Sequence, residues 1–182
     1  MGNNGRVVII RLGHRPGRDD RMTTHVGLTA RALGADRFVL VGGDAGPLDR
    51  INDVTERFGG PFGTDRVDSI GSFLSDWKGT VVHLTMYGLP VQEVIESIQE
   101  TSVRRSTDLA IVVGAGKVPF SVYERADWNV AITNQPHSEV ASLAVFLDRL
   151  WADESLEKTF EGGTHHVVPQ ECGKLVEECE PE

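Results

Sequence analysis

Short apolar runs alternate along the chain with longer segments in which apolar residues recur every three or four positions. The runs are rich in Val, Ile and Leu, which favours strands that are buried on both faces. The longer segments have the periodicity of amphipathic helices. We predict strands at residues 6–12, 37–41, 80–84, 109–113 and 129–133, and helices at residues 23–33, 47–58, 70–78, 90–100, 120–125 and 138–151.

This alternation indicates an α/β fold with a mostly parallel sheet and flanking helices. The 182 residues are expected to form one domain over residues 1–151, followed by a C-terminal extension over residues 152–182. The extension is acidic and interrupted by glycines. We predict a strand at residues 164–168 and a helix near residues 174–178, and we expect the extension to pack on the core or on a partner subunit.

Charge is distributed unevenly along a chain whose formal net charge is −9. Residues 1–37 hold seven arginines against three aspartates, whereas the rest of the chain is strongly acidic. The basic segment can contact a polyanion locally, but the acidic remainder argues against a general nucleic-acid coat. Because we find no apolar run of membrane-spanning length and no apolar signal segment, we expect a cytoplasmic protein without a membrane partner.

Two cysteines, Cys172 and Cys179, lie close to the C-terminus. Together with His165 and His166 they could be considered as zinc ligands, but their spacing matches no common zinc signature. Two cysteines placed in this way also do not form a disulfide framework. We therefore expect reduced, structurally incidental thiols and no bound metal.

The strand predicted at residues 109–113 runs into a glycine-rich loop with the sequence Gly114-Ala115-Gly116-Lys117-Val118-Pro119. It is not a P-loop, because neither Ser nor Thr follows Lys117, and it lacks the Rossmann glycine pattern. Its glycines would expose backbone groups to a nucleoside or an amino-acid ligand. A tight structural turn would also favour glycine, so the loop alone leaves both interpretations open.

The strand predicted at residues 129–133 runs into a polar loop that opens a helix. A capped helix N-terminus accounts for Pro136, Ser138 and Glu139. It does not account for Asn134 and the neighbouring Gln135 and His137, and the free N–H groups of a helix start can bind a ligand. A third loop, at residues 83–90, exposes apolar side chains that form either a packed turn or a wall against adenine.

Residues 11–25, which we call the arginine segment, contain four arginines and two histidines, namely Arg11, His14, Arg15, Arg18, Arg21 and His25. A solvated charged loop is one interpretation. The other is an RNA contact, because the guanidinium fork matches phosphate geometry. Arg21 and His25 are four positions apart and share a face if a helix begins there.

Taken together, these segments resemble the archaeal tRNA (cytidine(56)-2'-O)-methyltransferases, a branch of the SPOUT methyltransferases. The similarity covers residues 6–151 and continues more weakly through the extension. It is carried by Leu12-Gly13-His14-Arg15-Pro16 with Arg18, Asp19, Arg21 and Thr24-His25-Val26; by Leu84-Thr85-Met86-Tyr87-Gly88; by Val112 to Pro119; and by Asn134-Gln135-Pro136-His137-Ser138-Glu139-Val140-Ala141 with Phe146 to Leu150.

The resemblance implies a C-terminal trefoil knot, a homodimer, and S-adenosylmethionine bound in the cleft of the knot. It also implies 2'-O-ribose methylation of the T-loop cytidine at position 56 of tRNA. Mapped by motif, the residues that would hold the cofactor are Leu84, Gly114, Ala115, Gly116, Lys117, Val118, Ile132, Thr133, Asn134, Gln135, Pro136, His137, Ser138 and Glu139.

For catalysis the family resemblance points to an arginine near the first motif, and Arg21 is our first choice, with Arg15, Arg18 and His25 beside it. Arg31 is the alternative and is better explained as a structural residue. An arginine is a poor base because its pKa exceeds 12. We therefore expect it to stabilise the developing alkoxide while a phosphate assists deprotonation.

We expect tRNA to contact the arginine segment, with Arg104 and Arg105 as a second, weaker basic contact. Two other functions remain open at this point. One is a catalytically silent SPOUT-like module that binds RNA, which predicts weak cofactor binding or a dispensable arginine segment. The other is a small α/β protein that binds a phosphorylated metabolite, which predicts activity without tRNA.

Overall fold

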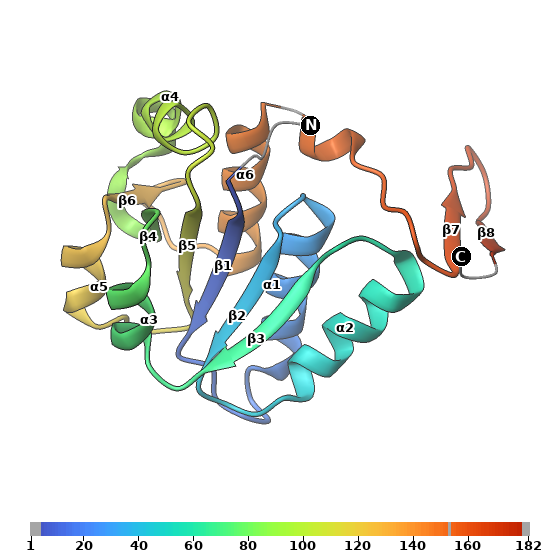
Figure 1. The fold of residues 1–182 in the computed structure, drawn as a ribbon, viewed down its shortest axis with the longest axis horizontal. Coiled ribbons are helices and arrows are strands. Elements are labelled where there is room, and N and C mark those ends of the chain that lie inside the picture. Colours follow the sequence, from blue (N-terminus) through green and yellow to red (C-terminus); the bar gives the residue numbers. More distant parts are fainter. Residues whose placement is uncertain (1–4, 153, 180–182) are drawn as a thin grey trace.

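The computed structural model describes residues 5–152 and 154–179. Its centre is a six-stranded parallel sheet with the strand order β3-β2-β1-β5-β4-β6 (Figure 1). The strands are β1 Val7–Leu12, β2 Arg37–Val41, β3 Gly63–Val67, β4 Thr80–Pro90, β5 Leu109–Gly114 and β6 Trp128–Ala131. Because all strands of this sheet are parallel, their carboxyl ends meet at one edge.

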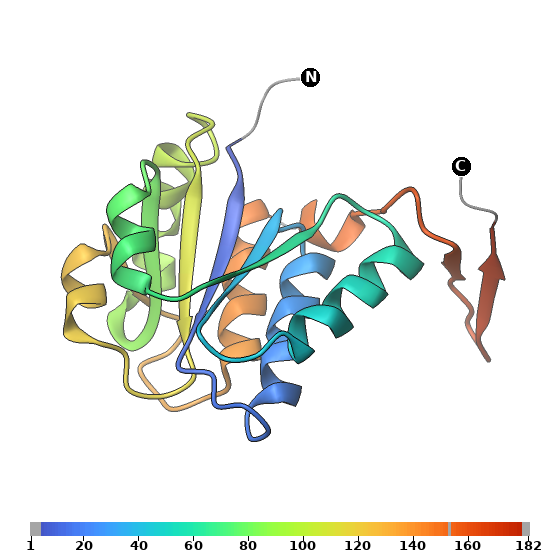
Figure 2. The same ribbon diagram turned by 60° about the horizontal axis from the view of Figure 1, so that its bottom comes forward.

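Helices cover both faces of the sheet. This is expected, because successive apolar residues of the central strands point to opposite faces and are all buried. They are α1 Asp20–Ala32, α2 Gly46–Phe58, α3 Ile70–Asp76, α4 Val91–Thr101, α5 Phe120–Arg125 and α6 Glu139–Trp151. One apolar cluster joins the sheet to α1, α2, α4 and α6, and a second joins the opposite face to α3 and α5 (Figures 1 and 2). The predicted α/β fold with a mostly parallel sheet is confirmed.

The edge strand β3 was not predicted from the sequence. Its residues, Gly-Thr-Asp-Arg-Val, are mostly polar and only partly buried, because one side of the strand has no neighbour. The apolar signal that marks the central strands is therefore missing. Pairing with β2 fixes this segment as a strand, with Phe38 beside Thr64 and Leu40 beside Arg66.

Strand β4 continues beyond its predicted end at residue 84 through an irregular segment. Leu84 and Leu89 both align with Val130 of β6, so the residues between them bulge out of the sheet. A Cβ on Gly88 would lie 2.5 Å from the backbone of Asn129, so only glycine permits this close approach. The bulge raises the side chain of Tyr87, which is 77% exposed.

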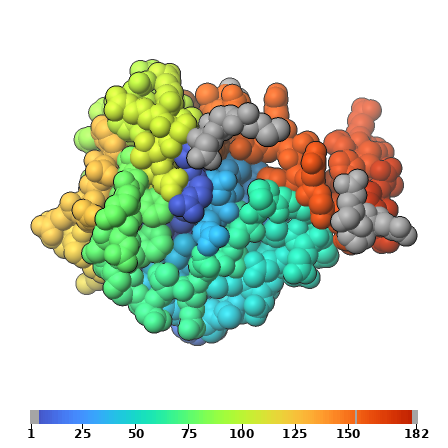
Figure 3. Space-filling view, viewed as in Figure 1, coloured from blue at the N-terminus to red at the C-terminus, as the bar shows by residue number. Residues whose placement is uncertain are grey.

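The C-terminal extension contains a short 3₁₀ helix, Glu154–Glu157, and an antiparallel hairpin of β7, His165–Val168, and β8, Leu175–Glu178. The helix predicted near residues 174–178 is therefore wrong. Leu175 and Val176 pair with Val168 and Val167 across the hairpin, and tertiary pairing outweighs local helix preference. The hairpin lies beyond the end of α2, at one side of the molecule (Figures 1 and 3).

The extension meets the rest of the chain at the C-terminal end of α2. The amide of Gly60 donates a hydrogen bond to the carbonyl of Glu161 at 2.8 Å, and the guanidinium of Arg31 stacks over the ring of Phe160. No helix in the described part of the chain is long and apolar enough to span a membrane.

Candidate functional site

A cleft of about 520 Å³ opens at the carboxyl edge of the sheet, beside the ends of β4 and β5 and the start of α6. Its volume lies in the range of small-molecule sites. Figure 2 shows the loops after β5 and β6 next to each other at this edge. The cleft is lined by three segments, residues 83–87, 113–118 and 135–139, together with Tyr123 and Ser142.

The glycine-rich loop after β5 is shaped by close backbone contacts. The amide of Ala115 donates a hydrogen bond to the carbonyl of Leu12 at 2.9 Å, which ties the loop to the end of β1. A Cβ on Gly114 would lie 2.3 Å from Cγ2 of Val118, whereas a Cβ on Gly116 would meet no atom within 4 Å. The loop is thus closed at its base, and its backbone is accessible at Gly116.

The bulge of β4 forms the second wall, and Asn134 holds it in place. The side-chain amide of Asn134 donates hydrogen bonds to the carbonyls of Met86 at 2.8 Å and Gly88 at 3.1 Å. These two bonds connect the loop after β6 to the bulge. Asn134 therefore shapes the cleft from outside rather than from its lining.

A buried polar network forms the floor of the cleft. Nδ1 of His83 lies 2.9 Å from Oδ1 of Asn129, whose amide donates to the carbonyl of Tyr123. The rings of His83 and Tyr123 meet edge to face at 4.5 Å. Burial lowers the pKa of His83 despite the opposing effect of the hydrogen bond that its ring donates to Asn129, so a neutral imidazole faces the cleft at neutral pH.

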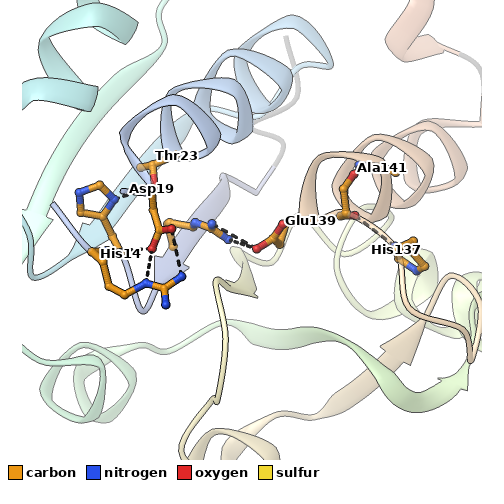
Figure 4. A network of polar contacts seen from close by, with 9 residues as sticks. His14, Asp19, Thr23, His137, Glu139 and Ala141 are labelled. Atoms are coloured by element: carbon orange, nitrogen blue, oxygen red, sulfur yellow. Dashed lines mark hydrogen bonds and ion pairs between the residues drawn. The ribbon is translucent and has the colours of Figure 1, made fainter. Parts of the chain in front are cut away.

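The third wall is the start of α6. The hydroxyl of Ser138 caps the helix by accepting a hydrogen bond from the amide of Ala141 at 3.2 Å. The next residue, Glu139, pairs with Arg11 at the end of β1 (Figure 4). Burial lowers the pKa of the Arg11 guanidinium, and the charge of Glu139 opposes that shift.

The arginine segment follows β1 at the same edge of the sheet (Figure 4). Arg15 forms a two-pronged ion pair with Asp19, with N–O distances of 2.8 and 3.1 Å, and holds the pKa of that carboxyl at about 2. Arg18, Arg21 and His25 are exposed, and Arg21 and His25 lie together on α1. The segment thus presents several cationic groups to solvent.

His14 anchors the arginine segment from beneath. Its side chain is buried, and Nδ1 lies 2.8 Å from the hydroxyl of Thr23. Nε2 lies 3.5 Å from a carboxylate oxygen of Asp20, and one ligand atom each from His14, Asp20 and Asp44 lie within 4.8 Å of one another. Exposed acidic groups commonly gather without an ion. The expectation of a metal-free site stays a prediction.

Most of the residues predicted to hold a cofactor line this one cleft. They are Leu84, Gly114, Ala115, Gly116, Lys117, Val118, Gln135, Pro136, His137, Ser138 and Glu139. Ile132, Thr133 and Asn134 do not line it. Ile132 packs against the apolar core, and the hydroxyl of Thr133 accepts a hydrogen bond from the amide of Gln135.

Several lining residues were missed by sequence reasoning. Val113 lies inside a predicted strand, and Tyr123 and Ser142 lie on helices, where apolar spacing accounted for them. His83 was considered only as part of the loop at residues 83–90. Two positional signals could have found some of them. Val113 lies next to the carboxyl end of a strand, and Ser142 lies one helical turn into α6. Arg31 lies away from the cleft, where it donates to the carbonyl of Gly59.

Comparison with known proteins places the chain among RNA-modifying enzymes. Residues 58–177 match the family described as tRNA ribose 2'-O-methyltransferase, aTrm56. The chain is 55% identical over 174 residues to the tRNA (cytidine(56)-2'-O)-methyltransferase of Haloquadratum walsbyi, covering 96% of this chain and 90% of that protein. It is 49% identical to the enzyme of the same name from Pyrococcus abyssi, covering 94% and 87% of the two chains.

Solved structures share the fold. An RNA 2'-O ribose methyltransferase superposes with a TM-score of 0.60 at 18% identity, over 84% of this chain. The SpoU methyltransferase AviRb from Streptomyces viridochromogenes, in complex with AdoMet, superposes with a TM-score of 0.57 at 13% identity over 82% of this chain. The chain spans 57% and 60% of these two proteins, and at such identities the likeness concerns the fold alone.

Proposed function

This chain belongs to the aTrm56 family of tRNA ribose 2'-O-methyltransferases, and from that premise we propose that it transfers a methyl group from S-adenosylmethionine to the ribose 2'-oxygen of cytidine 56 in tRNA. The observation that carries the proposal is the position of the cleft. Every residue that lines it lies within the matched region, residues 58–177. The region that matches the methyltransferase family therefore contains the whole lining of the cleft.

The residues of the cleft fit a bent nucleoside with an amino-acid tail. The backbone at Gly116 is open to the cleft, Met86 and Tyr87 offer an apolar wall, and the first turn of α6 offers free N–H groups. Leu84, the glycine-rich loop and residues 135–139 would hold the cofactor. When bound, S-adenosylmethionine supplies an electrophilic methyl group on a sulfonium.

The arginine segment is the proposed contact for the tRNA backbone. Arg18 and Arg21 are exposed at the same edge of the sheet as the cleft. Their guanidinium groups can hold phosphate and orient the ribose, since methyl transfer depends on alignment of the reacting atoms. Arg21 is proposed to stabilise charge that develops on the 2'-oxygen. Because tRNA is the proposed substrate, we propose that the chain acts in the cytoplasm.

We further infer a homodimer. Tyr87, Leu89 and Phe120 are 77%, 55% and 72% exposed, and they lie on the β4 bulge and at the start of α5, next to the cleft. Large apolar side chains gathered in this way mark an association surface. A second copy on this surface would cover the patch and add its own arginine segment near the cleft.

The trefoil knot also stays a proposal. The strand order places β4 between β5 and β6, and α6 then returns across the sheet to pack against α1. Such a path is compatible with α6 passing through the loop formed by the preceding segments. Knots are rare, so a topological trace of the backbone of an experimental structure is the direct test.

Isothermal titration with S-adenosylmethionine, followed by methyl transfer to unmodified tRNA, tests the proposed function. The proposal predicts cofactor binding without tRNA and transfer only with tRNA. Binding of tRNA without any transfer would favour a silent RNA-binding module. Binding of a phosphorylated metabolite, with no response to S-adenosylmethionine, would favour a small-molecule binder.

A further inference from the structure

Arg11 is a charged side chain in the most buried part of the sheet. It lies on the central strand β1, among apolar residues, and is completely inaccessible to solvent. A buried guanidinium is costly unless its donors are satisfied. In the described part of the chain its Nε has no hydrogen-bond partner. The favourable contacts of Arg11 are therefore those of its two terminal nitrogens, Nη1 and Nη2.

Those nitrogens contact Glu139. Nη1 and Nη2 of Arg11 lie 3.4 and 3.3 Å from the same carboxylate oxygen, Oε1 of Glu139. Oε2 makes no hydrogen bond with any described residue, and the Glu139 side chain is 27% exposed where it lines the cleft. One oxygen of Glu139 is thus fixed from behind, and the other is left for a group that enters the cleft.

The Arg11–Glu139 pair joins the start of the arginine segment to the lining of the cleft. Leu12, the residue after Arg11, accepts the hydrogen bond that ties down the glycine-rich loop. On the other side, Asp19 of the arginine segment is close enough to contribute an attraction to Arg11. A ribose held by the arginine segment and directed toward the cleft would arrive at Glu139 (Figure 4).

Resting on the proposed function, we propose that Glu139 accepts the proton of the ribose 2'-hydroxyl and that Arg11 is the positioning residue that holds its carboxylate. As the hydroxyl oxygen forms its bond to the methyl carbon, the O–H bond becomes strongly acidic. The proton passes to Oε2, the O–H electron pair stays on the new ether oxygen, and the C–S bond breaks with its electrons on sulfur. A carboxylate is a sufficient base for a proton lost in this way.

The N-terminal position of Glu139 on α6 supports the same role. Glu139 is the first residue of α6, directly after the Ser138 cap, so the helix start and the Arg11 contact together fix where its carboxylate lies. A guanidinium has no lone pair available to accept a proton, so the arginine side chains are poor candidates for the base. Glu139 thus provides the base, and Arg21 remains free to stabilise charge on the ribose.

The test is Glu139→Gln, assayed by single-turnover methyl transfer at saturating cofactor and tRNA. The amide keeps the shape and can still accept from Arg11, but it cannot take up the proton. We expect a rate about 10²- to 10⁴-fold lower, with a far smaller loss of S-adenosylmethionine affinity, although Glu139 lines the cofactor cleft. The melting temperature should fall, because glutamine leaves the buried Arg11 guanidinium without its charged partner. The remaining rate should rise with pH, because hydroxide then replaces the carboxylate. An unchanged rate, or a loss of cofactor affinity equal to the loss of rate, would overturn the proposal.

The pH profile is assignable because the other charged and titratable groups around the carboxylate stay in place. They are Arg11 on β1, Asp19 in the arginine segment, His83 and Tyr87 on β4, Tyr123 on α5, and Lys117 and His137 on the cleft loops. Glu139→Asp, which keeps a carboxylate, should recover part of the rate. If Glu139→Asp were as slow as Glu139→Gln and showed the same dependence on pH, the carboxylate would not be the base.

Arg11→Met tests the positioning role. It removes the charge and keeps much of the volume, and its loss of rate should not add to that of Glu139→Gln. Additive losses in the double variant would contradict it. If Arg11→Met did not fold, the Glu139 variants would still decide the proposal. If the wild-type enzyme labelled tRNA outside cytidine 56, or not at all, the proposed function itself would be refuted. Failure of the proposed function can therefore be distinguished from failure of the proposed role of Glu139.

Discussion

At the residue scale, the ion pair of Arg15 and Asp19 sets the conformation of the arginine segment. Asp19 has a folded-state pKa of about 2, below its ordinary value of 3.8. Because the folded state binds this proton less readily than the unfolded chain, the pair stabilises the fold above about pH 4 and loses that effect as the pH falls through 2.

An NMR titration of the Asp19 side-chain carbon checks this pair. The wild-type chain should titrate near 2, and Arg15→Ala should return the pKa of Asp19 toward 3.8, because the first cause of the shift is the Arg15 hydrogen bond. Arg37→Ala, which removes an arginine paired with Asp65 elsewhere, should leave it unaltered. An Asp19 that titrates normally in the wild type would disprove the pair in solution.

Gly114 tests the cofactor assignment of the glycine-rich loop. A valine there would place Cβ 2.3 Å from Cγ2 of Val118, so the loop has to move. We expect Gly114→Val to weaken S-adenosylmethionine binding at least about tenfold by calorimetry, because the backbone no longer lies where the ligand needs it. Gly71→Ala, whose Cβ has its closest neighbour at 3.6 Å, is the matched control. Wild-type affinity in Gly114→Val would remove the loop from the site.

Arg21 tests the separation of chemistry from cofactor binding. Arg21→Ala should lower methyl transfer about 10²-fold or more, since one positioned donor to a developing oxyanion has an effect of that size. The S-adenosylmethionine affinity should stay at the wild-type value. Arg105, an exposed arginine just before β5, belongs to the second, weaker tRNA contact that the sequence suggested, but it lies at the opposite edge of the sheet from the cleft. Arg105→Ala should therefore keep nearly full activity at saturating tRNA. Equal losses in the two variants would show a general charge effect instead.

At the scale of elements, apolar periodicity was enough to predict the central strands and the helices that pack on them. It failed at the margins for identifiable reasons. Edge strand β3 is polar because half of its surface is open, and β8 resembles a helix locally but pairs with β7. The β4 bulge could not be predicted from the sequence, because the need for glycine at position 88 arises only from the close approach of β6 in the folded chain.

The candidate site followed the same rule. Loop composition at strand ends, as at Gly114 and Ser138, made a ligand one of two interpretations, and the family resemblance then assigned these residues to the cofactor. Arg11 was predicted only as part of a basic segment, and His83 only as part of the loop at residues 83–90. The assembled sheet is what directs Arg11 to Glu139 and His83 into the cleft. Asn134 was predicted as a ligand contact and turned out to brace the bulge.

Phe160 tests how the extension attaches to the core. Its half-buried ring lies under the guanidinium of Arg31, whose central carbon is 4.8 Å from the ring centre. The ring also packs closely against Gly60. We expect Phe160→Ala to lower the free energy of unfolding by about 1–2 kcal/mol in urea, through lost apolar burial and the cation–π contact. Leu156→Ala, 70% exposed in the same extension, should cost less than about 0.5 kcal/mol. Equal effects would mean that the extension does not dock in this way.

At the scale of the whole molecule, the chain combines a basic edge with an acidic body. The net charge of −9 coexists with the arginine segment beside the cleft. The arginine segment concentrates positive charge in an otherwise acidic chain, so the charge distribution favours the approach of tRNA at that edge. The same edge holds the carboxyl ends of the parallel strands, which is where α/β folds place their ligands.

Transfer of labelled methyl from S-adenosylmethionine to unmodified tRNA, with the modified nucleoside mapped, tests the central claim most directly. A tRNA that carries 2'-deoxycytidine at position 56 is the matched substrate control. The account predicts 2'-O-methylcytidine at position 56 in the first tRNA and no label at that position in the second. Label on a base, label at another nucleotide, or equal labelling of both tRNAs would contradict it.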